Sequence, residues 1–222
     1  MSHLFSLQYF TGLFVLFVSI FILRELVAFL RILPLKYVLT PLVTISIFAF
    51  AMLAVRAFGM SPYTACIIAG LLFSLVADTL LMIEEIHMFI HGLIFFLLTH
   101  CCYIAAFSIG YSFAPWHGVL LAVFGALVVF FYGKIRAKKG GHAFPVLLYM
   151  SALLLMCFFA YSHVRHGDAT LGVLLPAAAT LFAISDSVLA VNTFIKKIPH
   201  STVLTWSLYA PAQFFIAVSC FF

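Results

Sequence analysis

The chain is a succession of long apolar runs separated by short segments that carry most of its charges. A helix that crosses a membrane needs about 20 mostly apolar residues, and the sequence divides into eight such runs. They cover residues 6–23, 37–55, 62–82, 86–108, 116–133, 144–162, 169–194 and 200–222. A charged, amphipathic stretch at 24–31 should continue the first helix into the membrane interface. The pattern predicts an all-α polytopic membrane protein, a single domain over 1–222 built as a bundle of eight transmembrane helices.

The composition supports a membrane protein and excludes several other classes. Of the 222 residues 66% are hydrophobic and only 8% are charged, whereas soluble domains are about half apolar and a quarter charged. No basic stripe indicates a nucleic-acid partner, and the composition is not that of a disordered chain. The five cysteines all fall in apolar runs without metal-type spacing, which favours free core residues. The first run has no basic residue before it and no cleavage site after it, so it is read as a helix rather than a removable signal.

Two of the apolar runs contain an aspartate deep inside them. Asp78 lies in Ser74-Leu-Val-Ala-Asp-Thr-Leu-Leu-Met82, and Asp186 lies in Phe182-Ala-Ile-Ser-Asp-Ser-Val-Leu-Ala-Val-Asn192. In both stretches a small residue precedes the aspartate and a small hydroxyl residue follows it. A carboxylate in hydrocarbon costs several kcal/mol or more, so an acid at this depth indicates a functional site. Each aspartate falls on the third helix of a four-helix half, which suggests a 4+4 internal duplication.

The basic residues predict the orientation of the chain in the membrane. Cytoplasmic loops carry an excess of Lys and Arg. The loops after odd-numbered runs hold Arg24, Arg31, Lys36, Lys134, Arg136, Lys138, Lys139, Lys196 and Lys197, against Arg56 and Arg165 on the other side. Both termini are therefore expected on the non-cytoplasmic side and both aspartates in the cytoplasmic half. Short loops and small size favour a bacterial inner membrane, with the endoplasmic reticulum as the alternative.

Further polar residues fall at the level of the two acids and are expected to form the wall of one polar cavity. They are Ser74, His100, Tyr103, Tyr149, Ser185, Asn192, Tyr209 and Gln213. Each alone is more often a helix–helix contact. Glu84, His87 and His91 have a spacing that fits one face of a helix, but a metal site needs three or four convergent ligands. We therefore expect neither a metal nor a cofactor.

In this order, the motifs around Asp78, His100–Tyr103, Tyr149, Asp186–Asn192 and Tyr209-x-x-x-Gln213 resemble the YhhN/TMEM86 family of lysoplasmalogenases. The resemblance runs from about residue 35 to the C-terminus. It implies a multi-helix membrane enzyme that hydrolyses the vinyl ether of 1-alkenyl lysophospholipids, releasing a fatty aldehyde and glycerophosphocholine or glycerophosphoethanolamine. Two positions depart from the family pattern. Ala77 stands where many members have Gly, and Thr40 stands where many have Lys before the proline of the second helix, so Lys36 is the candidate to replace that lysine.

The implied reaction fits the acids found in the sequence. Hydrolysis of a vinyl ether needs a protonated acid, a carboxylate that stabilises an oxocarbenium ion, and a water molecule, roles that two carboxyl groups divide in glycoside hydrolysis. Asp78 and Asp186 are the predicted catalytic pair, with either one as the acid. The other polar residues would orient water and the glycerol backbone, and Lys36 would contact the phosphate. The expected partners are a lysophospholipid and membrane lipids, without nucleic acid.

Two other classes of protein remain compatible with the residues alone. A proton-coupled transporter also places paired acids and tyrosines in a polar cavity, but its polar residues should continue to the far side of the membrane, and here they become sparse. A non-catalytic lipid-binding protein would not need two acids at depth.

Overall fold

The computed structural model describes residues 2–83, 88–136, 143–163 and 169–222, and every regular element within them is a helix. The long helices are α1 (Ser2–Phe29), α2 (Leu33–Phe58), α3 (Pro62–Met82), α4 (Phe89–Phe107), α5 (Pro115–Arg136), α6 (Ala143–Ser162), α7 (Leu171–Ala190) and α8 (Ser201–Val218). A π-helical turn, η3 (Val191–Ile195), continues α7, and a 3-10 turn, η4 (Ser219–Phe221), follows α8. Each predicted run corresponds to one helix, with ends that differ by a few residues.

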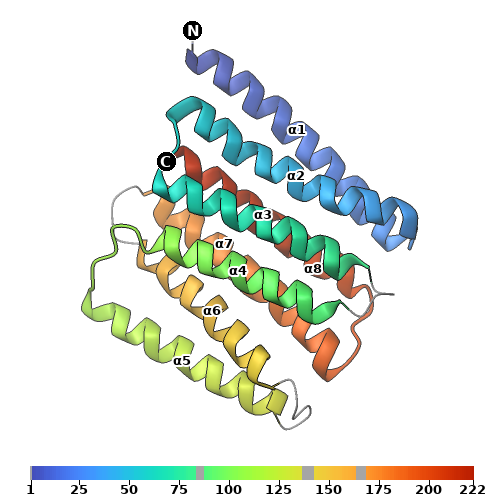
Figure 1. Cartoon of the computed structure of the whole chain (residues 1–222), viewed down its shortest axis with the longest axis vertical. Helices are drawn as coiled ribbons and strands as arrows, with labels where there is room; N and C mark the ends of the chain where they lie inside the picture. The colour runs from blue at the N-terminus through green and yellow to red at the C-terminus, as the bar shows by residue number, and fades with distance from the viewer. Residues whose placement is uncertain (1, 84–87, 137–142, 164–168) are drawn as a thin grey trace.

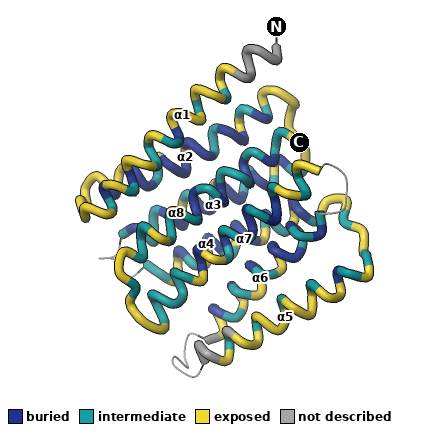
Figure 2. Tube along the Cα trace, turned by 180° about the vertical axis from the view of Figure 1, so that it is seen from behind, coloured by how far each residue is buried: buried dark blue, intermediate teal, exposed yellow. Residues whose placement is uncertain are grey.

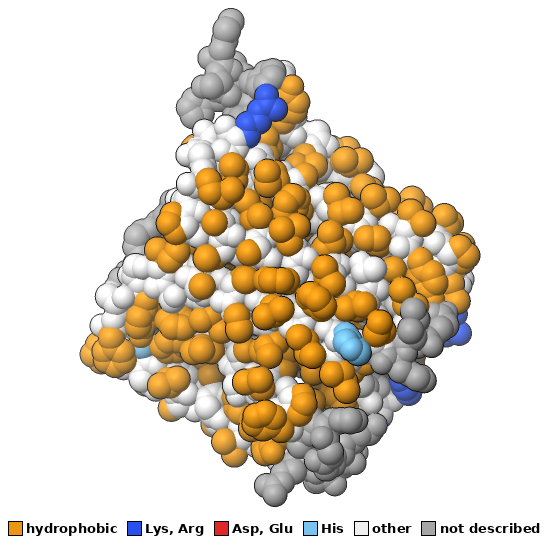
Figure 3. All heavy atoms as spheres, in the orientation of Figure 1, with side chains coloured by type: hydrophobic (Ala, Val, Ile, Leu, Met, Phe, Trp, Pro, Cys, Tyr) orange, Lys and Arg blue, Asp and Glu red, His pale blue; other side chains and the backbone are white. Residues whose placement is uncertain are grey.

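The prediction of an all-α polytopic membrane protein is confirmed. Seven of the described helices are long and apolar enough to cross a membrane, and the apolar part of α5, Pro115–Phe130, is shorter. Hydrophobic side chains cover the face of the molecule in Figure 3, and Lys and Arg atoms appear only near its ends. A surface of this kind needs lipid around it, because the largest apolar patch on a typical soluble monomer covers only a few hundred Å².

The helices lie side by side, with α1 and α5 at opposite edges and α3, α4, α7 and α8 in the middle (Figure 1). Burial follows this order, since exposed residues dominate the two outer helices and buried residues the central ones (Figure 2). Both termini lie at the same end of the bundle, as an even number of crossings requires.

The contacts between helices repeat from one half of the chain to the other. Helix α1 packs on α2, α2 on α3 and α3 on α4, and in the second half α5 packs on α6, α6 on α7 and α7 on α8. Across the halves, α2 packs on α8 and α6 packs on α4. Adding four to each helix number in the first half gives the pairs of the second half. The contact of α2 with α8 corresponds in the same way to the contact of α6 with α4. This symmetry is what a 4+4 duplication would produce, and the duplication itself stays a prediction.

Close backbone contact joins α3 to α4 in the middle of the bundle. A Cβ at Gly70 would lie 2.4 Å from the Tyr103 ring, and one at Gly92 would lie 2.6 Å from Leu81. Small residues permit such close contact between membrane helices. The Tyr103 side chain therefore lies flat against α3, and its hydroxyl group is directed toward α8, where Gln213 accepts its hydrogen bond.

The location predicted for the start of segment 24–31 was wrong. Helix α1 does continue to Phe29, but Arg24 is completely buried instead of facing the interface, and the Glu25 side chain is only 15% exposed. The two residues pair with each other at 2.7 Å, and the guanidinium also packs on the ring of Trp206 at 4.2 Å from its centroid. A buried charge is retained only when such partners compensate for lost water.

Candidate active site

Asp78 is the acceptor at the end of a chain of hydrogen bonds. Its Oδ2 accepts one from Thr44 Oγ1 at 2.7 Å and one from the Tyr209 hydroxyl at 3.0 Å. Gln213 Nε2 donates to the Tyr209 oxygen at 2.9 Å, and the Tyr103 hydroxyl donates to Gln213 Oε1 at 2.5 Å. Every donor in this series points toward the carboxyl group, so the bonds polarise one another in one direction. The arrangement suits a negative charge on Asp78.

Asp186 has a different environment, although it also lies about one turn before the end of its α-helix. Its Oδ2 accepts a hydrogen bond from the Tyr149 hydroxyl of α6. The ring of Tyr149 packs edge-on against His100, with centroids 5.1 Å apart. Ring contacts that run from Tyr149 through His100 and Phe182 to Tyr209 connect the partner of Asp186 with a partner of Asp78, so the two carboxyl groups belong to one packed cluster.

His100 is buried, and its ring packs against both Tyr149 and Phe182. Its Nδ1 lies 2.6 Å from the carbonyl oxygen of Phe96. Because a carbonyl oxygen can only accept, Nδ1 carries the hydrogen, and Nε2 of the neutral ring is an acceptor. Nε2 is buried and has no hydrogen-bond partner among the described residues. A water molecule or a substrate hydroxyl would satisfy it.

A cavity of about 100 Å³ opens beside Asp186, between α4, α6, α7 and η3. It is several times larger than the space that one water molecule needs. Its walls are mostly apolar and include Phe89, Leu93, Leu153 and Phe194, while Tyr149, Asp186 and Ser187 supply polar groups. Asp78 is not among its lining residues. An apolar pocket with a few polar groups at one side is the usual form of a site for a small or lipid ligand.

Aromatic rings fill the space between the cavity and the Asp78 network. Phe182 packs edge-on against both His100 and Tyr209, with centroids 5.1 and 5.3 Å apart. Phe96 contacts the same Phe182 and Tyr209 rings. These rings exclude water, which strengthens the electrostatic effect of the two acids on each other and on a bound ligand.

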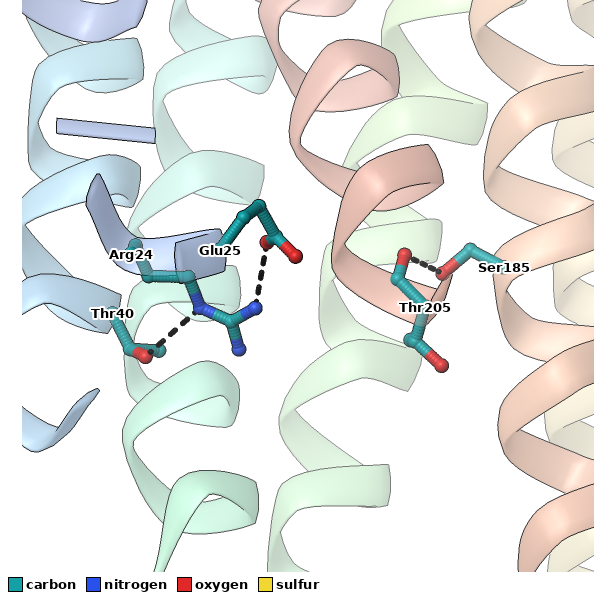
Figure 4. A network of polar contacts seen from close by, with 5 residues as sticks. All are labelled: Arg24, Glu25, Thr40, Ser185 and Thr205. Atoms are coloured by element: carbon teal, nitrogen blue, oxygen red, sulfur yellow. Dashed lines mark hydrogen bonds and ion pairs between the residues drawn. The ribbon is translucent and has the colours of Figure 1, made fainter. Parts of the chain in front are cut away.

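Several residues predicted for the cavity wall have other partners. Ser185 donates to the Thr205 carbonyl oxygen of α8 at 3.0 Å, as Figure 4 shows. Asn192 Oδ1 accepts from the Ile198 backbone N–H at 3.0 Å, which holds the segment after η3. Lys36 is buried in the first turn of α2, and its Nζ lies 6.0 Å from the Tyr37 ring centroid. The hydrogen bonds of Ser185 and Asn192 thus join backbone groups rather than the two carboxyl groups.

Of the other residues singled out in the sequence, some lie in the site and some lie outside the part of the chain that the structure describes. Ser74 is buried one turn before Asp78, donates to the Leu71 carbonyl oxygen at 2.9 Å and also contacts Tyr209. Two of the three residues with metal-type spacing, Glu84 and His87, lie outside the described residues. The third, His91, is exposed on α4. The five cysteines are free, as expected, but only Cys157 is buried, and Cys101 is exposed, so the expectation of core positions was wrong for Cys101.

Two residues of the site were missed in the sequence. Thr44 lies one turn after Thr40 on α2 and donates directly to Asp78; the i, i+4 spacing of two threonines in an apolar run was an available signal. Arg24 was assigned to a loop because it follows the first apolar run, although a charge within an apolar helix is itself a signal of function.

The structure thus defines a class: a polytopic membrane protein with two buried aspartates, one of which lines an apolar cavity. Residues 35–220 match the model of the YhhN family, and the chain belongs to that family. This confirms the resemblance of the motifs. Helix α1, with Arg24 and Glu25, precedes the matched segment.

Named relatives fall in the same group. The chain is 29% identical over 161 residues to human "Lysoplasmalogenase TMEM86A", a match that covers 71% of this chain and 66% of the relative. It is 30% identical over 164 residues to human "Lysoplasmalogenase TMEM86B", covering 72% and 66%, and 31% identical over 150 residues to the mouse protein of that name, covering 68% and 61%. The chain thus spans slightly less than two thirds of the length of these relatives. No solved structure matches the chain.

Proposed function

We propose that this protein is a lysoplasmalogenase, an enzyme that hydrolyses the vinyl ether bond of 1-alkenyl lysoglycerophospholipids. The single observation that carries the proposal is the burial of two carboxyl groups in one site, with one of them at the wall of an apolar cavity. The names of the relatives support the same reaction. The products would be a fatty aldehyde and a glycerophospho-choline or -ethanolamine.

Asp186 is assigned as the proton donor because it lines the cavity. Its proton moves to the β-carbon of the vinyl ether, and the electron pair of the double bond forms the new C–H bond. The ether oxygen shares its lone pair with the adjacent carbon, which leaves an oxocarbenium ion and the carboxylate of Asp186. Tyr149, which donates to Asp186 Oδ2, holds this carboxyl group in position in both states.

Asp78 is assigned as the fixed negative charge. The donors Thr44 and Tyr209 complement a carboxylate there, and the guanidinium of Arg24 interacts with it electrostatically. A preorganised charge in a site without water stabilises a cation that forms in the transition state. The arrangement resembles the two carboxyl groups of glycosidases, which also divide the roles of acid and anion.

Water then adds to the oxocarbenium carbon, and the proton it loses returns to Asp186. The Nε2 atom of His100 is placed to accept a hydrogen bond from that water. The hemiacetal loses its hydroxyl proton, the carbon–oxygen bond to glycerol breaks, and the glycerol oxygen takes up a proton. One water molecule is consumed, and the acid ends in its starting state.

The proposal places the alkenyl chain in the apolar cavity between α4, α6 and α7 and the reacting bond in the cytoplasmic half of the membrane. Both termini would then lie on the non-cytoplasmic side, in a bacterial inner membrane.

The test is aldehyde release from a 1-alkenyl lysophospholipid by the detergent-purified protein, beside the matching ester lysophospholipid. Aldehyde from the vinyl ether alone is the expected result. Free fatty acid from the ester would replace the proposal with a lysophospholipase activity. Intact, folded protein that releases neither product would contradict the proposal and favour transport.

A further inference from the structure

Arg24 and Glu25 form a buried charged pair of which the proposed chemistry uses only the positive charge of Arg24. Neighbours at i and i+1 on a helix point about 100° apart and do not ordinarily face each other. Here Arg24 Nη1 and Glu25 Oε1 are nevertheless 2.7 Å apart, so both side chains turn toward one point between α1 and α8, as Figure 4 shows. Arg24 Nε also lies 3.4 Å from Thr40 Oγ1 of α2. The pair is held by three helices.

Each member of the pair retains one buried polar atom without a partner. Arg24 Nη2 is a donor and Glu25 Oε2 is an acceptor, and neither forms a hydrogen bond within the described residues. The Arg24 side chain is 0% exposed. Leaving the charged atoms of a buried pair unsatisfied is costly, and a ligand that offers an acceptor next to a donor would satisfy both atoms at once.

We propose that Arg24 and Glu25 bind the zwitterionic headgroup of the lysophospholipid, with its phosphate on Arg24 Nη2 and its ammonium on Glu25 Oε2. The inference rests on the proposed function and specifies its substrate. Arg24 and Glu25 lie about a turn before the end of α1, close to the depth of Asp78 in α3. Arg24 Nε lies 3.4 Å from Thr40 Oγ1, and Thr44, one turn further along α2, donates to Asp78. This proximity suits a phosphate separated from the vinyl ether by only the glycerol backbone.

The chemistry of the two unpaired atoms also predicts a headgroup preference. An ethanolamine ammonium has N–H groups that Glu25 Oε2 can accept, whereas the quaternary ammonium of choline has none. The ethanolamine substrate should therefore bind more tightly than the choline substrate. A phosphate-free 1-alkenylglycerol should bind most weakly, because it loses the charge-assisted bond to arginine.

The experiment measures KM and kcat of the full-length protein for three 1-alkenyl substrates, with phosphoethanolamine, phosphocholine or a free hydroxyl at the third glycerol carbon. Arg24→Lys keeps the positive charge but removes the second amino group, and it should raise KM for both phosphate substrates by about ten-fold or more relative to any change in the 1-alkenylglycerol KM. Glu25→Gln should raise KM for the ethanolamine substrate alone. Arg56→Lys is the matched control, since Arg56 also lies near an aromatic ring, that of Tyr9, at the opposite end of the bundle.

Equal KM values for all three substrates in the wild type would overturn the inference. A loss of kcat at constant KM in Arg24→Lys would also overturn it, because Arg24 would then act only as the counter-ion of Asp78. Should either variant fail to fold, the KM values of the wild type for the three substrates still test the inference.

Binding of the saturated 1-alkyl analogues separates this inference from the proposed function, since these compounds cannot be hydrolysed by protonation of a double bond. Tighter binding of the alkyl phosphoethanolamine than of the alkylglycerol supports the headgroup site even if no aldehyde is ever released. Equal binding of the two contradicts it, whatever the enzyme does to vinyl ethers.

Discussion

The two aspartates follow similar sequence motifs, yet the two halves of the bundle surround them differently. Asp78 accepts hydrogen bonds from α2 and α8 and is covered by aromatic rings. Asp186 accepts its bond from α6 and borders the cavity. The cross-contacts explain part of the difference, since α8 contributes Tyr209 to Asp78 while the corresponding helix α4 contributes His100 beside Tyr149. One half thus supplies a shielded charge and the other an accessible acid.

In the proposed mechanism, the two similar halves of the bundle divide two catalytic roles. Two equivalent carboxyl groups in one low-dielectric site repel when both are ionised. Our proposal gives the negative charge to Asp78, which accepts two hydrogen bonds, and the transferable proton to Asp186, which lines the apolar cavity. If this is correct, the two positions should respond differently to the same substitution.

The largest expected effect is that of Asp186→Asn. The amide cannot donate a proton to carbon, so kcat should fall by about 10²–10⁴-fold, the usual contribution of a general acid. The measurement is aldehyde release at saturating substrate, with Ser187→Ala as the control, because Ser187 lines the same cavity and donates only to Ala183 of its own helix. Activity close to wild type in folded Asp186→Asn would remove the assigned acid.

Asp78→Asn should be the next largest, with a loss in kcat of about 10²–10³-fold, the range found when one electrostatic partner of a transition state is removed. An asparagine oxygen still accepts from Thr44 and Tyr209, so the melting temperature in detergent should change little. Rates of the two variants, measured side by side, sharpen the comparison. A kcat for Asp78→Asn below that for Asp186→Asn would reverse the assigned roles.

Removal of one tyrosine hydroxyl that donates to each aspartate should have a smaller effect on activity, and the two variants form a matched pair. Tyr149→Phe removes the donor to Asp186, and Tyr209→Phe removes one of two donors to Asp78. A hydrogen bond to a charged group contributes about 1.5–3 kcal/mol, so each variant should lose about ten-fold or more in kcat/KM. Tyr161→Phe, whose hydroxyl bonds to Thr180 away from both acids, is the control and should retain full activity.

The smallest expected effect concerns the cavity. Ala190 lines it near η3, and Ala190→Phe should raise KM several-fold for long alkenyl chains while sparing short ones, because the added ring occupies volume that a chain would fill. The measurement is KM across a series of chain lengths. Ala122→Phe, on the exposed face of α5, is the control. The same change in KM at every alkenyl chain length would mean that the alkenyl chain binds outside this cavity.

The sequence by itself determined the helices, the membrane setting and the two acids. A helix in lipid satisfies its own backbone hydrogen bonds, so about 20 apolar residues are enough to predict one, whatever its neighbours are. The cost of a carboxyl group in hydrocarbon is likewise a local property, and it identified Asp78 and Asp186 without knowledge of their partners. Tyr149, Tyr209 and Gln213 could be placed at the same level by counting residues along each run.

Only the tertiary structure decided which side chains meet. Ser185 and Asp186 are adjacent in sequence, yet one donates to the α8 backbone and the other borders the cavity, because successive residues on a helix face different neighbours. Thr44 and Arg24 joined the site through the rotation and packing of α1 and α2, which no pattern within those helices fixes. Helix rotation depends on contacts between segments distant in sequence, and for that reason only the fold shows which polar side chains contact each aspartate.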